Sequence, residues 1–290
     1  MYSAEFAYHR ARSVSDAHRL LAANPGAKLL AGGHSLIPLM KLRLATPPAV
    51  VDIGRIAELR GISRSGDTIR IGSLTTHAEI AASTDLQKSA PALAEAAALI
   101  GDPAVRSRGT IGGNIAHADP ASDLPTVLVA LDAQVVAIGP SGERTIAADG
   151  FFTGIMSTRL AENELVTAIV VPSAARGQGS AYVKFPHPAS RYAVIGVAAF
   201  VAMSNNGCTA ARVALGGLVP RATRARAVEQ GLTGQSLNDG AIAAAAAQVK
   251  ADLGDQVTGD IFASAAYRTA VAPVYVKRAI AAAAARAGLA

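Results

Sequence analysis

The sequence of 290 residues has one cysteine, no tryptophan and few aromatic residues, which make up 4% of the chain. A single cysteine cannot form a disulfide within the chain, so the protein is not a disulfide-stabilised scaffold. It also cannot supply the four thiolates of an iron–sulfur cluster or the ligands of a cysteine-type zinc site. We therefore interpret Cys208 as a structural residue.

Long apolar runs are also absent. The longest spans residues 193–203, about half of the roughly 20 residues that a membrane-spanning helix needs. The N-terminus has no basic start followed by an apolar stretch. We therefore predict no membrane span, no secretory signal and, by default, a cytoplasmic location.

The balance of charge is mildly basic, with 27 Lys and Arg against 21 Asp and Glu and a formal net charge of +6. A positive balance attracts nucleic acid and other anions. However, the basic residues are scattered, and no aromatic-rich basic stripe accompanies them of the kind that stacks bases. The composition therefore argues against a nucleic-acid partner.

What is present is ample apolar sequence, 51% of the chain, which is enough for a sizeable core. A stretch of small and polar residues at 172–180 has the composition of a linker. Before it, short helical and strand patterns alternate; after it, three strands precede three alanine-rich helices, which predicts an α+β fold. The C-terminal strands are expected at 181–185, 194–203 and 209–215, and the helices at 223–232, 239–253 and 267–287, the last kinked or displaced by Pro273.

Several local patterns in the first part predict individual elements. Ser13 opens a capping-box pattern that predicts a helix to about Ala23. Residues 62–71 alternate around a Ser-Gly-Asp turn, which is typical of a hairpin. The other predicted elements are a helix at 90–100 and strands at 134–138 and 165–171, around a Gly-Pro-Ser-Gly turn.

Two glycine pairs, Gly32-Gly33 and Gly112-Gly113, stand beside hydroxyl, imidazole and amide side chains. Because glycine lacks a Cβ atom, the backbone amides of such a pair can converge on a phosphate, and two loops can clamp a diphosphate from two sides. Each pair is equally well read as an ordinary turn, and the residues alone leave both interpretations open. Neither loop has the GxGxxG or GxxxxGK[ST] spacing, so the nucleotide-binding folds that these motifs mark are not supported.

The loop sequences AGGHSLIPLMKLRLATP and GTIGGNIAHADPASDLP resemble the two flavin-binding loops of the FAD-binding medium subunit of molybdenum hydroxylases. That family includes carbon monoxide dehydrogenases, aldehyde oxidases, xanthine dehydrogenases and aromatic hydroxylases. Three further segments also resemble it, in the same order over nearly the whole chain: IGSLTTHAEI, KFPHPASRYAVIGVAAF and YRTAVAPVYVKRAI.

The resemblance implies a two-subdomain FAD-binding domain of the PCMH type over residues 1–175. It implies a C-terminal domain of the CO dehydrogenase flavoprotein type over residues 176–290, with a three-stranded antiparallel sheet and three helices. The boundary between these two domains agrees with the linker composition at 172–180. The implied fold class is therefore α+β, as the pattern of elements also predicts.

The resemblance further implies an FAD-dependent oxidoreductase subunit that passes electrons from a partner iron–sulfur subunit through FAD to an external acceptor. The partners would be a large molybdenum-binding subunit and a small 2Fe–2S subunit, in a dimer of heterotrimers that carries the molybdenum cofactor and clusters outside this chain. No residue here is expected to act as a catalytic acid, base or nucleophile, or to bind a metal. Two alternatives stay open: a stand-alone flavin oxidoreductase and a non-catalytic assembly protein.

By resemblance, the backbone amides of both loops would hold the FAD pyrophosphate, and His117 would close on the same group. These expected cofactor-binding residues of the loops are Leu30, Ala31, Gly32, Gly33, His34, Ser35, Leu36, Thr110, Ile111, Gly112, Gly113, Asn114 and His117.

Five single residues complete the implied site. Asp123 is expected to accept a hydrogen bond from the ribose or adenine, and Ile100 and Leu165 to pack on the cofactor. Lys184 is expected near the flavin ring, where a cation stabilises the reduced, anionic form, and Tyr192 against the isoalloxazine. Each also has an ordinary interpretation: a helix N-cap for Asp123, core residues, a solvated strand lysine and a surface tyrosine.

Overall fold

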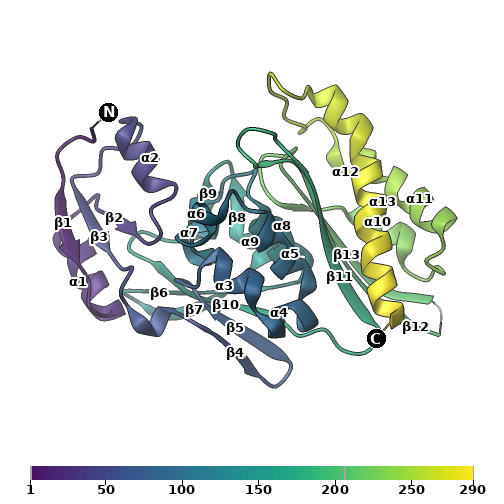
Figure 1. Ribbon diagram of the computed structural model, residues 1–290, viewed down its shortest axis with the longest axis horizontal. Coiled ribbons are helices and arrows are strands. Elements are labelled where there is room, and N and C mark those ends of the chain that lie inside the picture. Colours follow the sequence, from purple (N-terminus) through teal and green to yellow (C-terminus); the bar gives the residue numbers. More distant parts are fainter. Residues whose placement is uncertain (1, 206, 290) are drawn as a thin grey trace.

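The computed structural model describes residues 2–205 and 207–289. Three sheet-based units follow one another along the longest axis of the molecule (Figure 1). A small sheet lies at the N-terminal end, a five-stranded sheet with its helices lies in the middle, and a third sheet covered by helices lies at the C-terminal end.

The N-terminal unit is a parallel sheet in the order β1-β3-β2. Ser13 caps its first helix by accepting a hydrogen bond from the amide of Asp16 at 3.1 Å, which confirms the predicted helix start. The turn after β2 carries the first glycine pair. The elements are β1 (Ala7–Arg10), α1 (Val14–Ala23), β2 (Lys28–Leu30), α2 (Leu36–Lys41), β3 (Ala49–Asp52) and the 3₁₀ helix η1 (Ala57–Leu59).

The central sheet is antiparallel and has the order β4-β5-β10-β6-β7. The hairpin expected at 62–71 forms as β4 and β5, and both strands expected after it form as β6 and β10. The strands are β4 (Ile62–Ser65), β5 (Thr68–Gly72), β6 (Gln134–Gly139), β7 (Gly142–Ala147) and β10 (Leu165–Pro172), with a separate hairpin of β8 (Phe152–Gly154) and β9 (Ser157–Thr158).

One strand of the central sheet was not expected. The turn after β6 leads into β7. The strand expected at 165–171 forms as β10, which lies on the other side of β6, between β6 and β5. Strand β7 lies at the sheet edge, and only Ile146 among its residues is buried. Its sequence therefore lacks the alternation of apolar and polar residues that predicts a half-buried strand.

The helices of the central unit carry the second glycine pair and much of the main core. Helices α5 and α8 are nearly all apolar, and the cluster that they form includes Tyr182, Ala198 and Phe200 of the C-terminal sheet. The central and C-terminal units therefore share one core. The helices are α3 (His77–Ala82), α4 (Thr84–Ser89), α5 (Pro91–Leu99), α6 (Pro103–Arg106), α7 (Ile111–His117), α8 (Asp123–Ala130) and α9 (Ala148–Phe151).

The C-terminal unit has the three expected long strands and one additional two-residue strand, β14, in an antiparallel sheet. The helix expected from Thr223 begins at Arg226, because Thr223 and Arg224 pair with β13. The helix expected at 239–253 is split at Gln248, and the last helix continues through Pro273. The elements are β11 (Gln178–Pro186), β12 (Ala193–Ser204), β13 (Gly207–Gly216), β14 (Thr223–Arg224), α10 (Arg226–Leu232), α11 (Asp239–Ala247), α12 (Val249–Leu253) and α13 (Ala265–Leu289).

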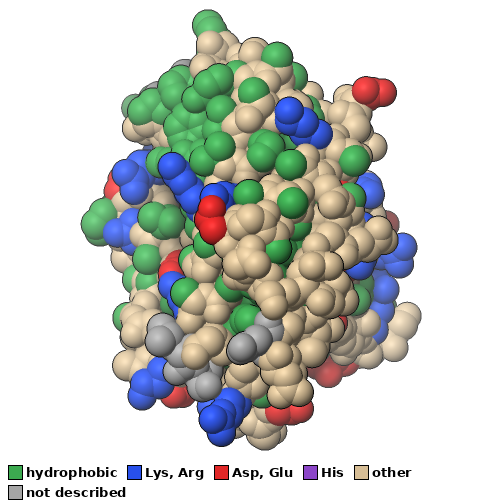
Figure 2. Space-filling view, turned by 90° about the vertical axis from the view of Figure 1, so that its right-hand side faces the viewer, with side chains coloured by type: hydrophobic (Ala, Val, Ile, Leu, Met, Phe, Trp, Pro, Cys, Tyr) green, Lys and Arg blue, Asp and Glu red, His purple; other side chains and the backbone are tan. Residues whose placement is uncertain are grey.

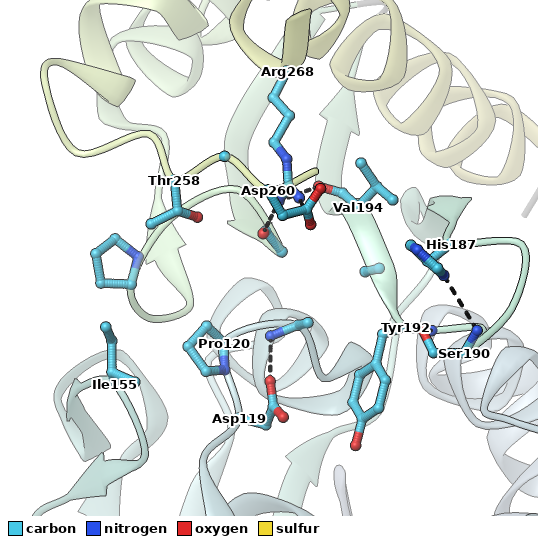
Figure 3. Close-up of a pocket in the computed structure, with 15 residues that line it drawn as sticks. Asp119, Pro120, Ile155, His187, Ser190, Tyr192, Val194, Thr258, Asp260 and Arg268 are labelled. Atoms are coloured by element: carbon cyan, nitrogen blue, oxygen red, sulfur yellow. Dashed lines mark hydrogen bonds and ion pairs between the residues drawn. The ribbon is translucent and has the colours of Figure 1, made fainter. Parts of the chain in front are cut away.

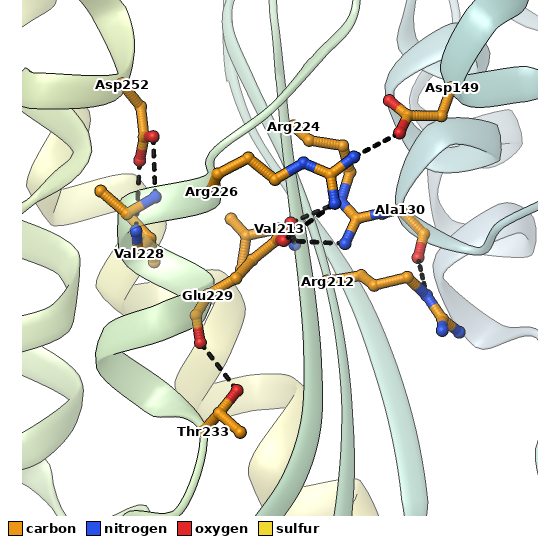
Figure 4. Close-up of polar contacts among 11 residues, drawn as sticks. Ala130, Asp149, Arg212, Val213, Arg224, Arg226, Val228, Glu229, Thr233 and Asp252 are labelled. Atoms are coloured by element: carbon orange, nitrogen blue, oxygen red, sulfur yellow. Dashed lines mark hydrogen bonds and ion pairs between the residues drawn. The ribbon is translucent and has the colours of Figure 1, made fainter.

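A buried carboxylate, Glu229, joins α10 to the C-terminal sheet (Figure 4). Both of its oxygens accept hydrogen bonds from the guanidinium of Arg224, and one also accepts from the amide of Val213 at 2.9 Å. The side chains of Glu229 and Arg224 are each 9% exposed. The pair is therefore held away from water, where an unpaired charge would be costly.

Two arginines next to this pair reach the central unit (Figure 4). Arg226 forms an ion pair with Asp149 of α9 at 2.5 Å, and Arg212 donates to the carbonyl oxygen of Ala130 at 3.0 Å. The guanidinium of Arg212 also lies 4.0 Å from the centre of the Phe200 ring. These contacts fix the C-terminal unit against the helices of the central unit.

The face that carries the C-terminal helices is shown in Figure 2. Hydrophobic side chains gather in its upper part, while basic and acidic side chains are scattered over the rest. The exposed apolar residues just before α13 and in its first half are Ile261, Phe262, Tyr267 and Val274. Within residues 2–205 and 207–289, no helix has the length and apolar character to cross a membrane.

Replacing Glu229 with alanine should lower the free energy of unfolding by about 3 kcal/mol, because it leaves Arg224 charged and buried without its partner. Urea unfolding measures this change. The matched control is Asp239→Ala. It removes an ion pair with Lys277 in which the Asp239 side chain is 85% exposed. The control should change stability only slightly, and equal effects of the two substitutions would contradict the role given to Glu229.

Candidate functional site

The two glycine loops, far apart in sequence, lie directly against each other. A Cβ atom added at Gly32 would lie 2.1 Å from the carbonyl oxygen of Arg108, and one added at Gly113 would lie 3.8 Å from the Cβ of Ala31. The backbone of the first loop therefore touches the backbone just before the second. Only glycine at position 32 allows this approach, which an ordinary surface turn would not require.

The first loop presents a run of backbone donors without acceptors. In the part of the chain that the structure describes, the amides of Gly32, Gly33, His34, Ser35 and Leu36 make no hydrogen bond. Gly33 has φ +78°, and the ring of His34 folds back so that Nδ1 lies 3.0 Å from the carbonyl oxygen of Gly32. Consecutive free amides in a glycine-containing turn are suited to binding an anion.

The second loop differs, because its amides are bonded within the protein. The donors and acceptors are Ile111 to the Thr75 carbonyl (3.1 Å), Gly112 to the Ser73 carbonyl (2.8 Å) and Gly113 to the Thr110 hydroxyl (3.2 Å). A Cβ at Gly112 would lie 2.5 Å from the Cβ of Ser73. The second loop is therefore fastened to the segment after β5, and it supports the first loop while offering side chains of its own.

Buried polar atoms without partners lie around the second loop. They are the hydroxyl of Ser73, Nδ1 of His77 and the side-chain oxygen of Asn114. The amide nitrogen of Asn114 donates to the hydroxyl of Ser122 at 3.2 Å, so its oxygen is free to accept. Because buried polar groups are nearly always paired, these atoms indicate a partner that is not part of the chain.

Asp123 and Lys184, expected as separate cofactor contacts, form one buried ion pair. The ammonium of Lys184 donates to Oδ2 of Asp123 at 2.8 Å and to the carbonyl oxygen of Leu99 at 3.2 Å. The hydroxyl of Tyr182 donates to Oδ1 of Asp123 at 2.5 Å. The Lys184 side chain is 2% exposed, which excludes a solvated lysine, and Ser122 rather than Asp123 occupies the N-cap of α8.

The environment of this triad, Asp123, Tyr182 and Lys184, also sets its protonation. Burial raises the pKa of Asp123, and the charge of Lys184 and the hydrogen bonds from Lys184 and Tyr182 oppose that rise. Burial and the charge of Asp123 raise the pKa of Tyr182 well above 10, so its hydroxyl stays protonated and acts as the donor.

Most of the other expected residues lie at the ends of helices or strands. Ile100 directly follows Leu99 at the end of α5, and His117 ends α7; both are half-buried. Leu30 ends β2, directly before the first loop. Leu165 begins β10 and is buried in a cluster with Leu74 and residues of the N-terminal unit, and its expected contact with the cofactor stays a prediction.

Two hollows flank α7. The smaller, of about 150 Å³, is lined by Gly32, Arg108 and Thr110, at the start of the helix. The larger, of about 310 Å³, is lined by Asp119 just beyond the end of the helix and by Tyr192. Helix α7 has seven residues and, at 1.5 Å per residue, is about 10 Å long. The two hollows therefore lie at opposite ends of one short helix.

The larger hollow lies between the central and C-terminal units (Figure 3). Asp119, Pro120 and Ile155 lie on one side, and Thr258, Asp260 and Arg268 lie on the other. Arg268 is fully engaged, by Asp260 at 2.5 Å and by the carbonyl oxygen of Gly217 at 2.7 Å. Burial, with the charges of Asp119 and Asp123, raises the pKa of Tyr192, so its hydroxyl stays neutral at the rim.

Sequence reasoning missed Tyr182, His77 and Arg108. Tyr182 and Lys184 stand two positions apart on a strand and so share a face, a signal that was available from the sequence. His77 lies in the segment IGSLTTHAEI, whose resemblance was noted without assigning it a role. The part played by Arg108 is its carbonyl group, which no side-chain pattern reveals. Among the described residues, no group of three or more His, Cys, Asp and Glu is placed to hold a metal ion.

Comparison with known families gives two matches. Residues 4–174 match the family described as the FAD binding domain in molybdopterin dehydrogenase. Residues 180–283 match the family described as the CO dehydrogenase flavoprotein C-terminal domain.

Curated proteins of similar sequence are medium chains and FAD-binding subunits. The carbon monoxide dehydrogenase medium chain of Hydrogenophaga pseudoflava is 44% identical over 99% of this chain and 99% of its own. The glyceraldehyde dehydrogenase medium chain of Sulfolobus acidocaldarius is 38% identical over 87% of this chain and 90% of its own. The xanthine dehydrogenase FAD-binding subunit of Escherichia coli O157:H7 is 35% identical over 80% of each.

Solved structures give the same result for the fold. A chain of carbon monoxide dehydrogenase from Hydrogenophaga pseudoflava superposes with a TM-score of 0.94 at 45% identity, over 99% of both chains. A chain of quinoline 2-oxidoreductase from Pseudomonas putida 86 superposes with a TM-score of 0.91 at 30% identity, again over 99% of both. These superpositions confirm the predicted α+β fold class.

His77 underlies the second loop and should make stability depend on pH. Its side chain is buried, and a Cβ added at Gly109 would lie 2.8 Å from its Nε2. Burial, together with the charges of His34 and Arg106, lowers the pKa of His77 from 6.5 to about 4. The folded protein thus holds the ring neutral, while the unfolded chain takes up a proton as the pH falls below 6.5.

The stability that the neutral ring contributes is present above pH 6.5 and is lost as the pH falls towards 4, a loss of up to about 3 kcal/mol. Urea unfolding across that range should show this decline in the wild type and a weaker decline in His77→Gln. His34→Gln, which changes an exposed ring, should retain most of the decline, because burial is the main cause of the lowered pKa and the charge of His34 only adds to it. A decline of the same size in His77→Gln would contradict the assignment.

Proposed function

The chain belongs to the family of FAD-binding medium subunits of molybdenum hydroxylases, and we propose that its paired glycine loops hold FAD in an electron-transfer subunit of such an enzyme. The observation that carries this proposal is the run of free amides from Gly32 to Leu36, beside the backbone contact with Arg108. A diphosphate carries about two negative charges, which amide donors can compensate without a lysine.

The residues of the site suit the parts of FAD in order. The first loop takes the diphosphate, and the supported second loop adds the Thr110 hydroxyl and the free side-chain oxygen of Asn114, which can accept from a cofactor hydroxyl. The length of α7, about 10 Å, suits the sugar-alcohol chain of FAD. The ring system would then be held near Tyr192, which lines the larger hollow, with Ile100 and Lys184 as the further contacts that the resemblance implies.

When bound, FAD supplies the redox chemistry by which electrons from a partner iron–sulfur subunit pass to an external acceptor. The residues of this chain bind and orient the cofactor, and none is assigned a role as acid, base or nucleophile. The division of the chain at residues 175 and 176 into an FAD-binding and a C-terminal domain is supported by the two family matches, at 4–174 and 180–283.

The single cysteine supports the assignment of the clusters to another subunit, since four thiolates hold one. We infer a large molybdenum-binding subunit and a small 2Fe–2S subunit as partners, in a dimer of heterotrimers. The related medium chains belong to dehydrogenases of carbon monoxide, glyceraldehyde and xanthine. The substrate of the assembled enzyme is therefore determined by the partner and not by this chain.

The purified chain, or its complex, should be yellow and bind one FAD per chain in a fluorescence titration. Extraction and quantification of the bound flavin gives the stoichiometry. A chain that binds no FAD either alone or in its complex would overturn the proposed function.

Gly32→Ala should weaken FAD binding at least tenfold, because the added methyl group would lie 2.1 Å from the carbonyl oxygen of Arg108 and would force the two loops apart. Gly150→Ala is the matched control, since a Cβ there meets no atom within 4 Å. Titration of both variants with FAD, alongside urea unfolding, separates lost binding from lost stability. Unchanged affinity in Gly32→Ala would contradict the role of the loop contact.

A further inference from the structure

We propose that Tyr182 is a positioning residue for the cofactor: its hydroxyl holds the Asp123 carboxylate and, through it, sets the position of the Lys184 ammonium that would act on the ring system. This inference rests on the proposed function, because it assigns roles in the same FAD site. It replaces the expectation that Asp123 meets the ribose or adenine with a role in holding Lys184.

The geometry places the three side chains at a junction of three elements. Tyr182 and Lys184 point from the same face of β11, towards the first residue of α8 and the last residue of α5. Gly196 stands opposite Lys184 on β12, and a Cβ there would lie 2.5 Å from the Tyr182 hydroxyl oxygen. The absence of a side chain at position 196 therefore leaves the space that the hydroxyl occupies.

The donors and acceptors of the triad are nearly all used within the protein. Each oxygen of Asp123 receives one hydrogen bond, from Tyr182 or from Lys184. The Lys184 ammonium has three N–H groups, of which one is bonded to Asp123 and one to the Leu99 carbonyl at the end of α5. The structure gives the third N–H of Lys184 no partner among the described residues, and the carbonyl end of α5 favours the positive charge.

The triad is also connected to both parts of the cofactor site. Ser122, next to Asp123, accepts a hydrogen bond from Asn114 of the second loop, at 3.2 Å. The charge of Asp123 helps to raise the pKa of Tyr192, which lines the larger hollow. The triad is therefore joined to the second loop through Ser122, and Asp123 is near enough to Tyr192 for its charge to help raise the pKa of that residue.

Tyr182 and Lys184 compete for the negative charge of Asp123. When the Tyr182 hydroxyl donates a hydrogen bond to Asp123, it stabilises part of the negative charge. Asp123 then neutralises the Lys184 ammonium less, and the positive potential at the cofactor is higher. Without the Tyr182 hydroxyl, Asp123 pairs with Lys184 alone, and the positive potential at the ring system falls. The reduced, anionic flavin then loses more stabilisation than the oxidised form.

The test is Tyr182→Phe in the full chain, with Tyr267→Phe as a control at a half-exposed tyrosine on α13. In Tyr182→Phe the affinity for reduced FAD should fall tenfold more than that for oxidised FAD. For this two-electron couple that difference lowers the midpoint potential by about 30 mV. Equilibration with a redox dye measures the potential, and a fluorescence titration measures the affinity for oxidised FAD. The control should leave both unchanged.

A second variant tests whether Tyr182 acts through Lys184. Lys184→Met should lower the potential by itself, and adding Tyr182→Phe to it should produce no further shift. If Tyr182→Phe fails to fold, Gly196→Ala serves in its place, since the new methyl group would displace the hydroxyl.

The outcomes separate the two proposals. A wild-type chain that binds no FAD overturns the proposed function. A wild-type chain that binds FAD, with an unchanged or raised potential in Tyr182→Phe, overturns this inference alone and leaves Tyr182 a structural residue. An additive effect in the double variant likewise overturns the route through Lys184.

Discussion

The close approach of the Gly32 backbone to the carbonyl of Arg108 is the constraint on which the site depends. It brings two loops from different units into contact without any side chain between them. The amides of the second loop donate hydrogen bonds to the carbonyl oxygens of Ser73 and Thr75, and these bonds hold the loop in place. The first loop therefore lies on a fixed support while its own amides stay unbonded. Free donors and a rigid support are the two properties that anion binding requires, and each loop supplies one of them.

Buried charge joins the units in a way that apolar packing alone would not specify. Asp123 and Lys184 pair across the boundary between the central and C-terminal units, and Arg226 reaches Asp149 across the same boundary. Arg286 of the last helix pairs with Glu95 of α5. Because charged pairs are costly unless their geometry is satisfied, these contacts select one register of the C-terminal sheet over the shared core. The positions of Lys184 and Tyr192 relative to the glycine loops follow from that register.

Local signals in the sequence were sufficient for elements whose cause is local. The cap at Ser13, the hairpin at 62–71 and the glycine pairs depend on residues a few positions apart. The missed elements depend on distant ones: β14 exists because it pairs with β13, and β7 is an exposed edge that needs no apolar alternation. The same holds for the site. The glycine pairs marked the two loops as candidates while leaving an ordinary turn open, whereas the partners of Asp123 come from a strand some sixty residues later in the chain.

The junction at Lys184 also has a consequence for the order of events while the chain is being made. Synthesis proceeds from the N-terminus, so both glycine loops and their supports emerge well before β11 does. A nascent chain at that stage has the donors for a diphosphate but lacks Tyr182, Lys184 and Tyr192. On the site proposed above, the contacts to the ring system therefore form only after the C-terminal sheet has been made.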